Sequence, residues 1–162
     1  MSAQSIPTVV MASISFYVGV YHFLIYFRRR QHREDLTFAL MFLTTGFYDV
    51  FCAGLYSATS VAEGVQWQRA QFIALAFFTT AFLWFVSDYT HQKPSIAIYA
   101  FSAFFLLALV VQVVDRSSLT WVVERPSVKE ILLPLGLQVT YYEATLGPFT
   151  TLQGLMGPVA GI

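Results

Sequence analysis

The side chain with the clearest chemical potential in this sequence is a carboxylate inside an apolar run. Asp49 lies in FLTTGFYDVFCAGLY, residues 42–56, with no lysine or arginine nearby. On a helix it would share one stripe with Thr45, Cys52 and Tyr56, and this stripe of small and polar residues is expected to face the interior of a helix bundle. Two roles follow: a carboxylate that binds a proton or a ligand, or a hydrogen-bonded aspartate that ties two helices together.

A second group of candidate residues follows in the next part of the chain. Trp67 and Arg69 form a W-x-R pair close to Glu63. The long Arg69 side chain could reach inward from the outer surface toward Asp49. We predict a small-molecule pocket at the outer mouth of the bundle, with these ligand-binding candidates: Asp49, Tyr56, Trp67 and Arg69. The alternative is a set of interfacial anchors, in which Trp67 belongs to the aromatic belt and Arg69 snorkels.

His22 is a candidate cofactor ligand, because a buried histidine could ligate a haem or titrate near neutral pH. Together with Tyr26 it could also contact a quinone. The other histidines, His32 and His91, lie in or beside the expected inner loops, so a haem with two histidine ligands is not expected. A hydrogen-bonded packing histidine is the alternative. No bound cofactor is therefore predicted, and contact with a lipid or a quinone stays open.

No pattern of catalytic or metal-binding residues accompanies these side chains. The single cysteine, Cys52, rules out a multi-cysteine metal site and an internal disulfide. The sequence has no glycine-rich phosphate loop, zinc-ligand pair or nucleophile elbow. The formal net charge is zero, so nucleic acid is not a predicted partner. We predict a protein that is not an enzyme and has no metal site.

The surrounding sequence predicts that membrane-spanning helices carry these residues. Of the 162 residues, 57% are hydrophobic and 11% are charged, whereas a soluble domain has about 25% charged residues. Four apolar runs reach the roughly 20 residues that a spanning helix needs; they cover residues 6–27, 36–58, 69–89 and 95–114. None alternates like a barrel strand. The predicted fold is all-α, a polytopic bundle of four complete transmembrane helices within residues 1–114.

The rest of the chain differs in kind from these spans. Residues 115–147 contain LTWVV and LQVTYYEAT, which are rich in β-branched and aromatic residues. They predict a structured segment on the outer face, either a short β-hairpin or an amphipathic interfacial segment. Residues 148–162 are apolar but too short to cross a bilayer. They are expected to form a partial fifth span or an interfacial segment.

Positive charges set the expected orientation. Arginines crowd the first loop and a lysine lies in the third: Arg28, Arg29, Arg30, Arg33 and Lys93. The positive-inside rule then places both loops in the cytoplasm. The N-terminus, the second loop and residues 115–147 are accordingly expected outside. The lipid bilayer is the first expected partner.

The order of these features resembles a known family. Trp67–Arg69 is followed by a third span ending in FLWFVSDYT, and the outer segment closes with YYEATLGPF. These stretches resemble the N-terminal seven-helix membrane sensor region found ahead of bacterial histidine kinases and diguanylate cyclases. In that family the third span tends to end before a Tyr-Thr, here residues 89–90. An outer segment tends to close with Gly-Pro and an aromatic residue, here residues 147–149. Seven spans are expected and four complete ones are present, so the chain would be a fragment or a shortened relative.

The resemblance implies a membrane sensory-input module for signal transduction, without catalysis, in a bacterial inner (cytoplasmic) membrane. The alternative is an accessory subunit of a larger respiratory or photosynthetic membrane complex, which the 17% aromatic content would suit. A quinone or haem anchor ranks third. Other membrane subunits or a second copy of the chain are the expected protein partners. No site residue is carried over from the family.

Overall fold

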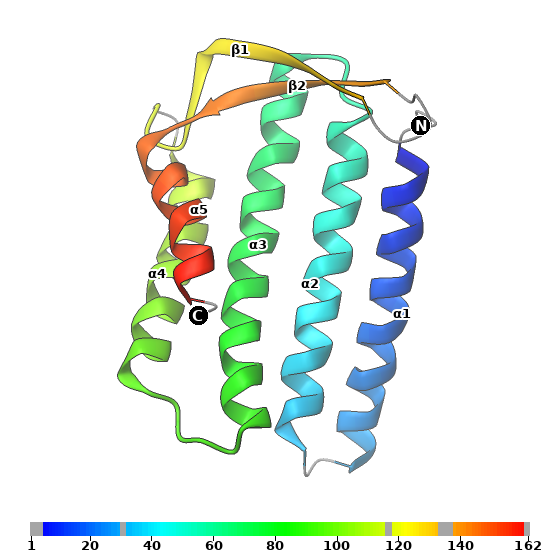
Figure 1. Ribbon diagram of the computed structural model, residues 1–162, viewed down its shortest axis with the longest axis vertical. Coiled ribbons are helices and arrows are strands. Elements are labelled where there is room, and N and C mark those ends of the chain that lie inside the picture. The colour runs from blue at the N-terminus through cyan, green and yellow to red at the C-terminus, as the bar shows by residue number, and fades with distance from the viewer. Residues whose placement is uncertain (1–4, 30–31, 116–117, 133–137, 161–162) are drawn as a thin grey trace.

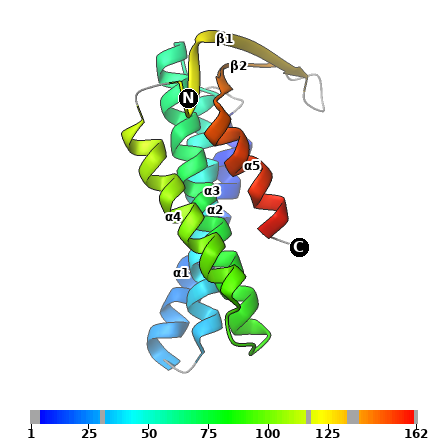
Figure 2. The same cartoon turned by 90° about the vertical axis from the view of Figure 1, so that its left-hand side faces the viewer.

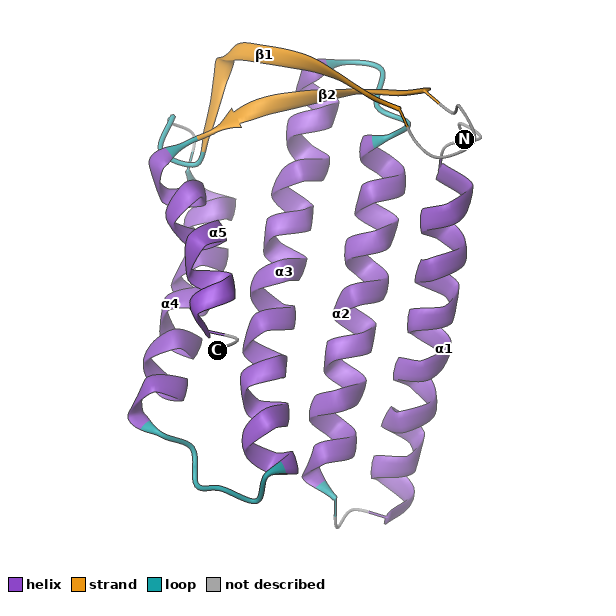
Figure 3. Cartoon of the chain, viewed as in Figure 1, coloured by secondary structure: helices purple, strands orange, loops and turns teal. Residues whose placement is uncertain are grey.

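Four long helices lie side by side, with a β-hairpin across one end of them (Figure 1). The structure is a computed structural model that describes residues 5–29, 32–115, 118–132 and 138–160. In chain order the elements are α1 (Ile6–Arg29), α2 (Arg33–Leu55), α3 (Val61–Tyr89), α4 (Ile96–Val114), β1 (Trp121–Leu132), β2 (Gln138–Leu146) and α5 (Pro148–Ala160). The strands are a small part of the molecule (Figure 3). The first four helices are each long and apolar enough to cross a membrane, so the predicted fold class is confirmed.

The helix boundaries differ from the predicted spans most clearly at α3. The apolar run predicts a start at residue 69, but the helix begins at Val61. Ser60 is its N-cap and accepts a hydrogen bond from the Glu63 amide at 3.3 Å, while the Glu63 carboxylate accepts one from the Thr59 amide at 3.0 Å. This reciprocal arrangement is a close variant of a capping box, which satisfies amides at a helix start. The cap therefore begins α3 two turns before the hydropathy signal does.

The extra turns make α3 longer than a bilayer requires. Its 29 residues correspond to roughly 43 Å at the α-helical rise, whereas the hydrocarbon core of a bilayer is about 30 Å thick. The first turns of α3 therefore rise beyond the other helices, as Figure 1 shows. The hairpin docks on these turns.

Glycines allow the first three helices to pack closely. A Cβ added at Gly46 of α2 would lie 2.9 Å from the Phe16 ring of α1, and one added at Gly54 would lie 2.5 Å from the Trp67 ring of α3. Both distances are shorter than real Cβ contacts. Helix association in membranes depends on such close backbone approach at small residues.

A hydrogen bond joins α3 to α4. Near the C-terminal end of α3, the Trp84 indole N–H donates to the Ser102 hydroxyl of α4 at 3.1 Å.

The hairpin is antiparallel and docks on the outer turns of α3. Its register pairs Trp121 with Leu146 at one end and Leu132 with Gln138 at the other, with an irregularity between residues 122 and 126. The Ala144 amide donates to the Gln68 side-chain oxygen at 3.0 Å. Trp121 and Ala144 are both 1% exposed and form a small apolar core with Val65. Of the two alternatives for the outer segment, the structure therefore has the β-hairpin.

Gly64 fixes how closely the hairpin approaches α3. A Cβ at this position would meet the Tyr142 backbone carbonyl oxygen at 2.6 Å. Because that neighbour is backbone, it cannot move aside as the end of a flexible side chain can. By contrast, a Cβ at Gly157 of α5 would meet nothing within 4 Å.

We predict that Gly64→Ala destabilises the protein and that Gly157→Ala does not. Overpacking typically costs about 1–3 kcal/mol, so Gly64→Ala should lower the melting temperature in detergent micelles and speed proteolysis within the hairpin. Gly157→Ala should leave both unchanged or raise stability, since alanine is favoured over glycine in a helix by roughly 1 kcal/mol. A Gly64→Ala protein that melts at or above the wild-type temperature would contradict the docking geometry.

Candidate functional site

Asp49 lies on the face of α2 that the hairpin overhangs. It is partly exposed and makes no hydrogen bond or ion pair with the residues that the structure describes. Tyr56, on the same stripe of α2, stacks edge-on against Tyr141 of β2 with ring centroids 5.8 Å apart. In the rotated view of Figure 2, the hairpin projects past the helices on the side where α5 lies. The end of this stripe therefore contacts β2 of the hairpin through Tyr56.

A small apolar cavity opens on this face. Thr45 and Tyr48 of α2 and Leu75 and Phe78 of α3 line a volume of about 160 Å³. We call this surface, made by Thr45, Tyr48, Asp49, Tyr56, Leu75 and Phe78, the Asp49 face. Its chemistry combines an apolar floor with a single carboxylate in the outer half of the span. A lipid-soluble molecule with one polar group would match that combination.

The two phenols at the edge of this face, Tyr56 and Tyr141, are neutral at physiological pH, because the ordinary pKa of tyrosine is already about 10. Burial raises the pKa of Tyr141 further. Neutral phenols remain hydrogen-bond donors at any physiological pH. The outer edge of the Asp49 face is therefore polar without adding a second charge to Asp49.

The other two predicted ligand-binding residues lie elsewhere. Trp67 packs within the α2–α3 interface, where its ring lies against Gly54 and 6.2 Å from the Phe51 ring. Arg69 follows two residues later, which on a helix is a rotation of about 200°, so its side chain leaves α3 on the side away from α2. Its Nε atom is buried and has no hydrogen-bond partner within the described ranges.

The predicted cluster of Asp49, Tyr56, Trp67 and Arg69 is therefore brought together only in part. Asp49 and Tyr56 share a face, and no ion pair between Asp49 and Arg69 occurs among the described residues. Arg69 also does not open the third helix, as the apolar run predicted, because α3 already starts at Val61. The expected helix-tying partner of Asp49 is not found in the described part of the chain.

His22, the cofactor candidate, joins two helices. Its Nδ1 atom lies 2.9 Å from the Asp35 carboxylate of α2, and its ring packs against Phe38 with centroids 4.6 Å apart. This is the arrangement of the alternative expectation, a hydrogen-bonded packing histidine. Whether the ring also meets a lipid or a quinone stays a prediction.

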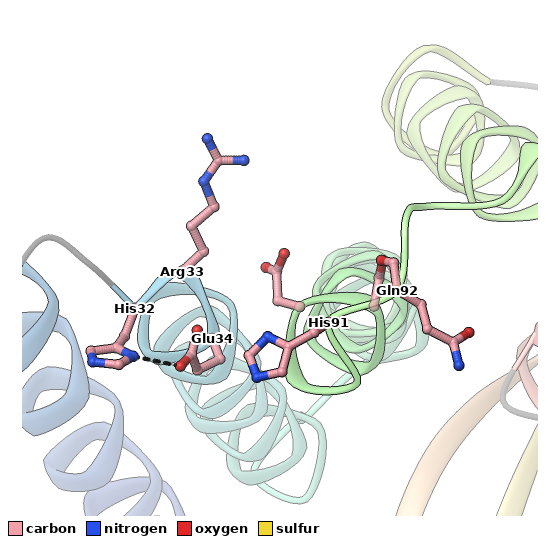
Figure 4. A pocket seen from close by; sticks show the side chains of 7 residues that line it. His32, Arg33, Glu34, His91 and Gln92 are labelled. Atoms are coloured by element: carbon pink, nitrogen blue, oxygen red, sulfur yellow. Dashed lines mark hydrogen bonds and ion pairs between the residues drawn. The ribbon is translucent and has the colours of Figure 1, made fainter.

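A polar cavity of about 470 Å³ lies at the opposite end of the molecule, between the start of α2 and the end of α3. Figure 4 shows His91 lying beside Glu34, whose carboxylate is 2.8 Å from His32 Nδ1. Thr37 donates to the Asp88 carboxylate across the same helices at 3.3 Å. Within the described ranges, no group of three or more histidine, cysteine or acidic residues could hold a metal ion. Within this cavity, Glu34 pairs with His32 and Asp88 accepts a hydrogen bond from Thr37.

Sequence reasoning missed the polar residues that join the hairpin to the helices. Gln112 of α4, Trp121 of β1, and Thr150 and Gln153 of α5 are all at most 1% exposed and are connected by hydrogen bonds. We call these four residues the Gln112 network. One signal was available: Gln112 is an isolated amide in the apolar run LLALVVQVV. Its partners could not be found this way, because they come from separate segments.

These features define a polytopic helical membrane protein with a β-hairpin cap at one end. Residues 7–152 match the family described as the N-terminal 7TM region of histidine kinase. The match covers well over half of the chain, so the chain belongs to this family, and the resemblance in the sequence is confirmed. Membership points to a membrane sensory-input region. No curated protein and no solved structure matches the chain.

We predict that the His22–Asp35 contact stabilises the inner end of the bundle. Both side chains are partly buried, at 29% and 21% exposed. His22→Leu would leave the carboxylate without its partner, at a cost of about 1–3 kcal/mol. The matched control is His32→Leu, because His32 is 52% exposed in its pair with Glu34 and exposed pairs contribute at most about 1 kcal/mol. Thermal unfolding in micelles measures both; equal losses would refute the prediction.

Proposed function

We propose that this chain is a non-catalytic sensory-input module that takes its signal on the Asp49 face. Family membership supports the class of function. The observation that carries the site is the Asp49 carboxylate, which has no partner among the described residues. A carboxylate near the bilayer centre costs about 2.5–3.5 kcal/mol on insertion scales. Such an insertion cost indicates that a carboxylate without a protein partner has a function at this position.

The chemistry of the face indicates the class of ligand. The cavity lined by Thr45 and Tyr48 of α2 and by Leu75 and Phe78 of α3 lies one helical turn along α2 from Asp49. Its apolar lining favours an apolar body. Asp49 favours a protonated amine or another strong hydrogen-bond donor. We therefore propose a lipid-soluble molecule with one cationic or donor group, which reaches the face from the bilayer.

Binding alone would not signal. A ligand shifts a conformational equilibrium only by its differential affinity for two states. The Asp49 face is bordered by α2, α3 and the hairpin, and Tyr56 contacts the hairpin directly through Tyr141. A ligand held at Asp49 would therefore favour one position of the hairpin over α2.

We also propose that the N-terminus and hairpin lie outside the cytoplasmic membrane of a bacterium. The start of α1 and the hairpin are at the same end of the molecule (Figure 1). The first loop, flanked by Arg28, Arg29 and Arg33, and the loop containing Lys93 lie at the other end, as the positive-inside rule requires for a cytoplasmic side. The bilayer is the proposed partner of the apolar outer surfaces, where Tyr17 is 75% and Ile96 is 88% exposed.

No described contact or comparison favours the accessory-subunit alternative or a quinone or haem anchor, so neither is proposed. Association with another membrane subunit or with a second copy remains part of the proposal for the sensor. Sensory modules act on neighbours, and the exposed apolar surfaces of α1 and α4 are available for that role.

Asp49 variants test the site with a long-chain amine as the probe. We expect dodecylamine to bind the protein in lipid nanodiscs at least tenfold more tightly than dodecanol. Asp49→Leu and Asp49→Asn should abolish this preference, because both remove the negative charge. Asp49→Leu should also raise the melting temperature, since it removes a buried charge from the span. Val50→Leu, on the adjacent position of α2, should change neither property.

Equal binding of amine and alcohol by the wild-type protein would reject the proposed ligand class. Retention of the preference in Asp49→Leu would reject Asp49 as the site.

Single-cysteine labelling tests the orientation. On a Cys52→Ala background, Val128→Cys in the hairpin and Gln92→Cys in the third loop are both exposed positions. In intact spheroplasts, a membrane-impermeant maleimide should label the cysteine at position 128 at once and the cysteine at position 92 only after permeabilisation. The opposite order would mean that the N-terminus is inside.

A further inference from the structure

Gln112 connects three elements through one buried amide. Its nitrogen donates to the Thr150 hydroxyl at 2.9 Å and to the Gln153 side-chain oxygen at 3.2 Å. Its oxygen accepts from the Trp121 indole N–H at 2.9 Å. Gln112 is 1% exposed. One side chain of α4 therefore joins the first residue of the hairpin to two residues of α5.

The connections continue to α3. The Gln153 nitrogen donates to the Phe72 backbone carbonyl at 3.0 Å, and the Phe72 ring packs edge-on against Trp121 with centroids 5.4 Å apart. The hairpin, α4, α5 and α3 therefore meet at one buried point. The side-chain amides of Gln112 and Gln153 both have hydrogen-bond partners. Loss of one of these bonds therefore leaves a buried polar group unsatisfied.

In the described part of α5 the buried side chains are polar and most exposed side chains are apolar, which is the reverse of a helix held by apolar packing. Its buried positions include Thr150 at 0% and Gln153 at 1% exposed, whereas Leu152, Leu155 and Val159 are 41%, 63% and 54% exposed. Polar contacts between membrane helices are individually weak. The position of α5 therefore depends on a few hydrogen bonds, and those bonds share Gln112 with the hairpin.

The start of α5 is tied to the start of the hairpin by backbone. The Gly147 amide donates to the Thr120 carbonyl at 2.8 Å, and the Phe149 amide donates to the Leu119 carbonyl at 3.1 Å. A Cβ at Gly147 would meet the Leu119 carbonyl oxygen at 2.3 Å, so this junction accepts only glycine without rearrangement. The start of the helix is thus held by the backbone of Gly147 and Phe149, and the helix is held further along by the Gln112 network.

We propose that the Gln112 network is a conformational coupling that transmits the position of the hairpin to α5. This inference rests on the proposed function, in which a ligand on the Asp49 face biases the hairpin. Movement of β1 displaces the Trp121 indole, and the Gln112 amide then exchanges or loses its bonds to α5. A purely structural network would support stability but would not relay a change made at the hairpin.

Hydrogen exchange separates these two roles without any ligand. Tyr56→Cys and Tyr141→Cys on a Cys52→Ala background place a thiol on α2 and one on β2, which a short bismaleimide can join. Peptide-level exchange of residues 148–160 in micelles is then compared before and after cross-linking. With the network intact, we expect the cross-link to slow exchange in α5 at least threefold.

Three further variants carry the test. Trp121→Phe removes the indole donor together with part of the ring, and Gln112→Leu removes the amide; either should reduce the effect of the cross-link on α5 to less than 1.5-fold. Trp121→Phe keeps an aromatic ring in the core and serves if Gln112→Leu does not fold. Gln71→Leu is the matched control: this buried amide lies outside the network, and its described partner, Cys52 Sγ, is already absent from the Cys52→Ala background. It should keep the full threefold effect.

The coupling is overturned if the cross-link leaves α5 unchanged in the protein with an intact network. It is also overturned if the effect survives in Trp121→Phe, or if Gln71→Leu abolishes it. Amine binding at Asp49 is measured separately, so a failure of the proposed ligand site and a failure of the coupling give different results.

Discussion

The length of α3 is the constraint on which the rest of this structure depends. A helix of 29 residues exceeds what a bilayer of about 30 Å can bury, so its outer turns need a protein partner. The hairpin supplies that partner through Gly64, Val65 and Gln68. Once the hairpin lies across these turns, it overhangs the Asp49 face and carries the chain back down into α5. The protruding turns of α3, the docked hairpin and the short helix α5 therefore all follow from the difference in length between α3 and the bilayer.

Hydropathy alone was sufficient to predict the spanning helices, because a bilayer requires long apolar runs whatever their partners are. It could not locate the start of α3, since residues 61–68 mix polar and apolar side chains and their helix begins at the Ser60–Glu63 cap. The capping pattern was present in the sequence and would have shown it. The prediction that Arg69 lies near Asp49 depended on the same boundary. Because α3 starts at Val61, Arg69 lies in the third turn of the helix. Its position two residues after Trp67 also turns its side chain away from α2. Pairwise contacts such as Gln112 with Gln153 depend on tertiary structure, which no local pattern encodes.

The Gln112 network and Asp49 are two different kinds of polar site in the described chain. The residues of the Gln112 network are buried and have their partners within the protein, and each bond holds two elements in place. Asp49 has none among the described residues. In a medium that cannot hydrogen-bond, the first kind rigidifies and the second remains costly until something arrives to satisfy it. A sensor needs both kinds, because a signal must be received at one place and conveyed through another.

The chain's three tryptophans lie at three different interfaces. Trp67 sits between α2 and α3, Trp84 bonds to Ser102 of α4, and Trp121 bonds to Gln112 under the hairpin. Indole fluorescence responds to local polarity and hydrogen bonding, so single-tryptophan versions of this protein would each report on one joint. The three tryptophans are thus intrinsic fluorescent probes. The order in which their fluorescence changes would show the order in which the three interfaces rearrange.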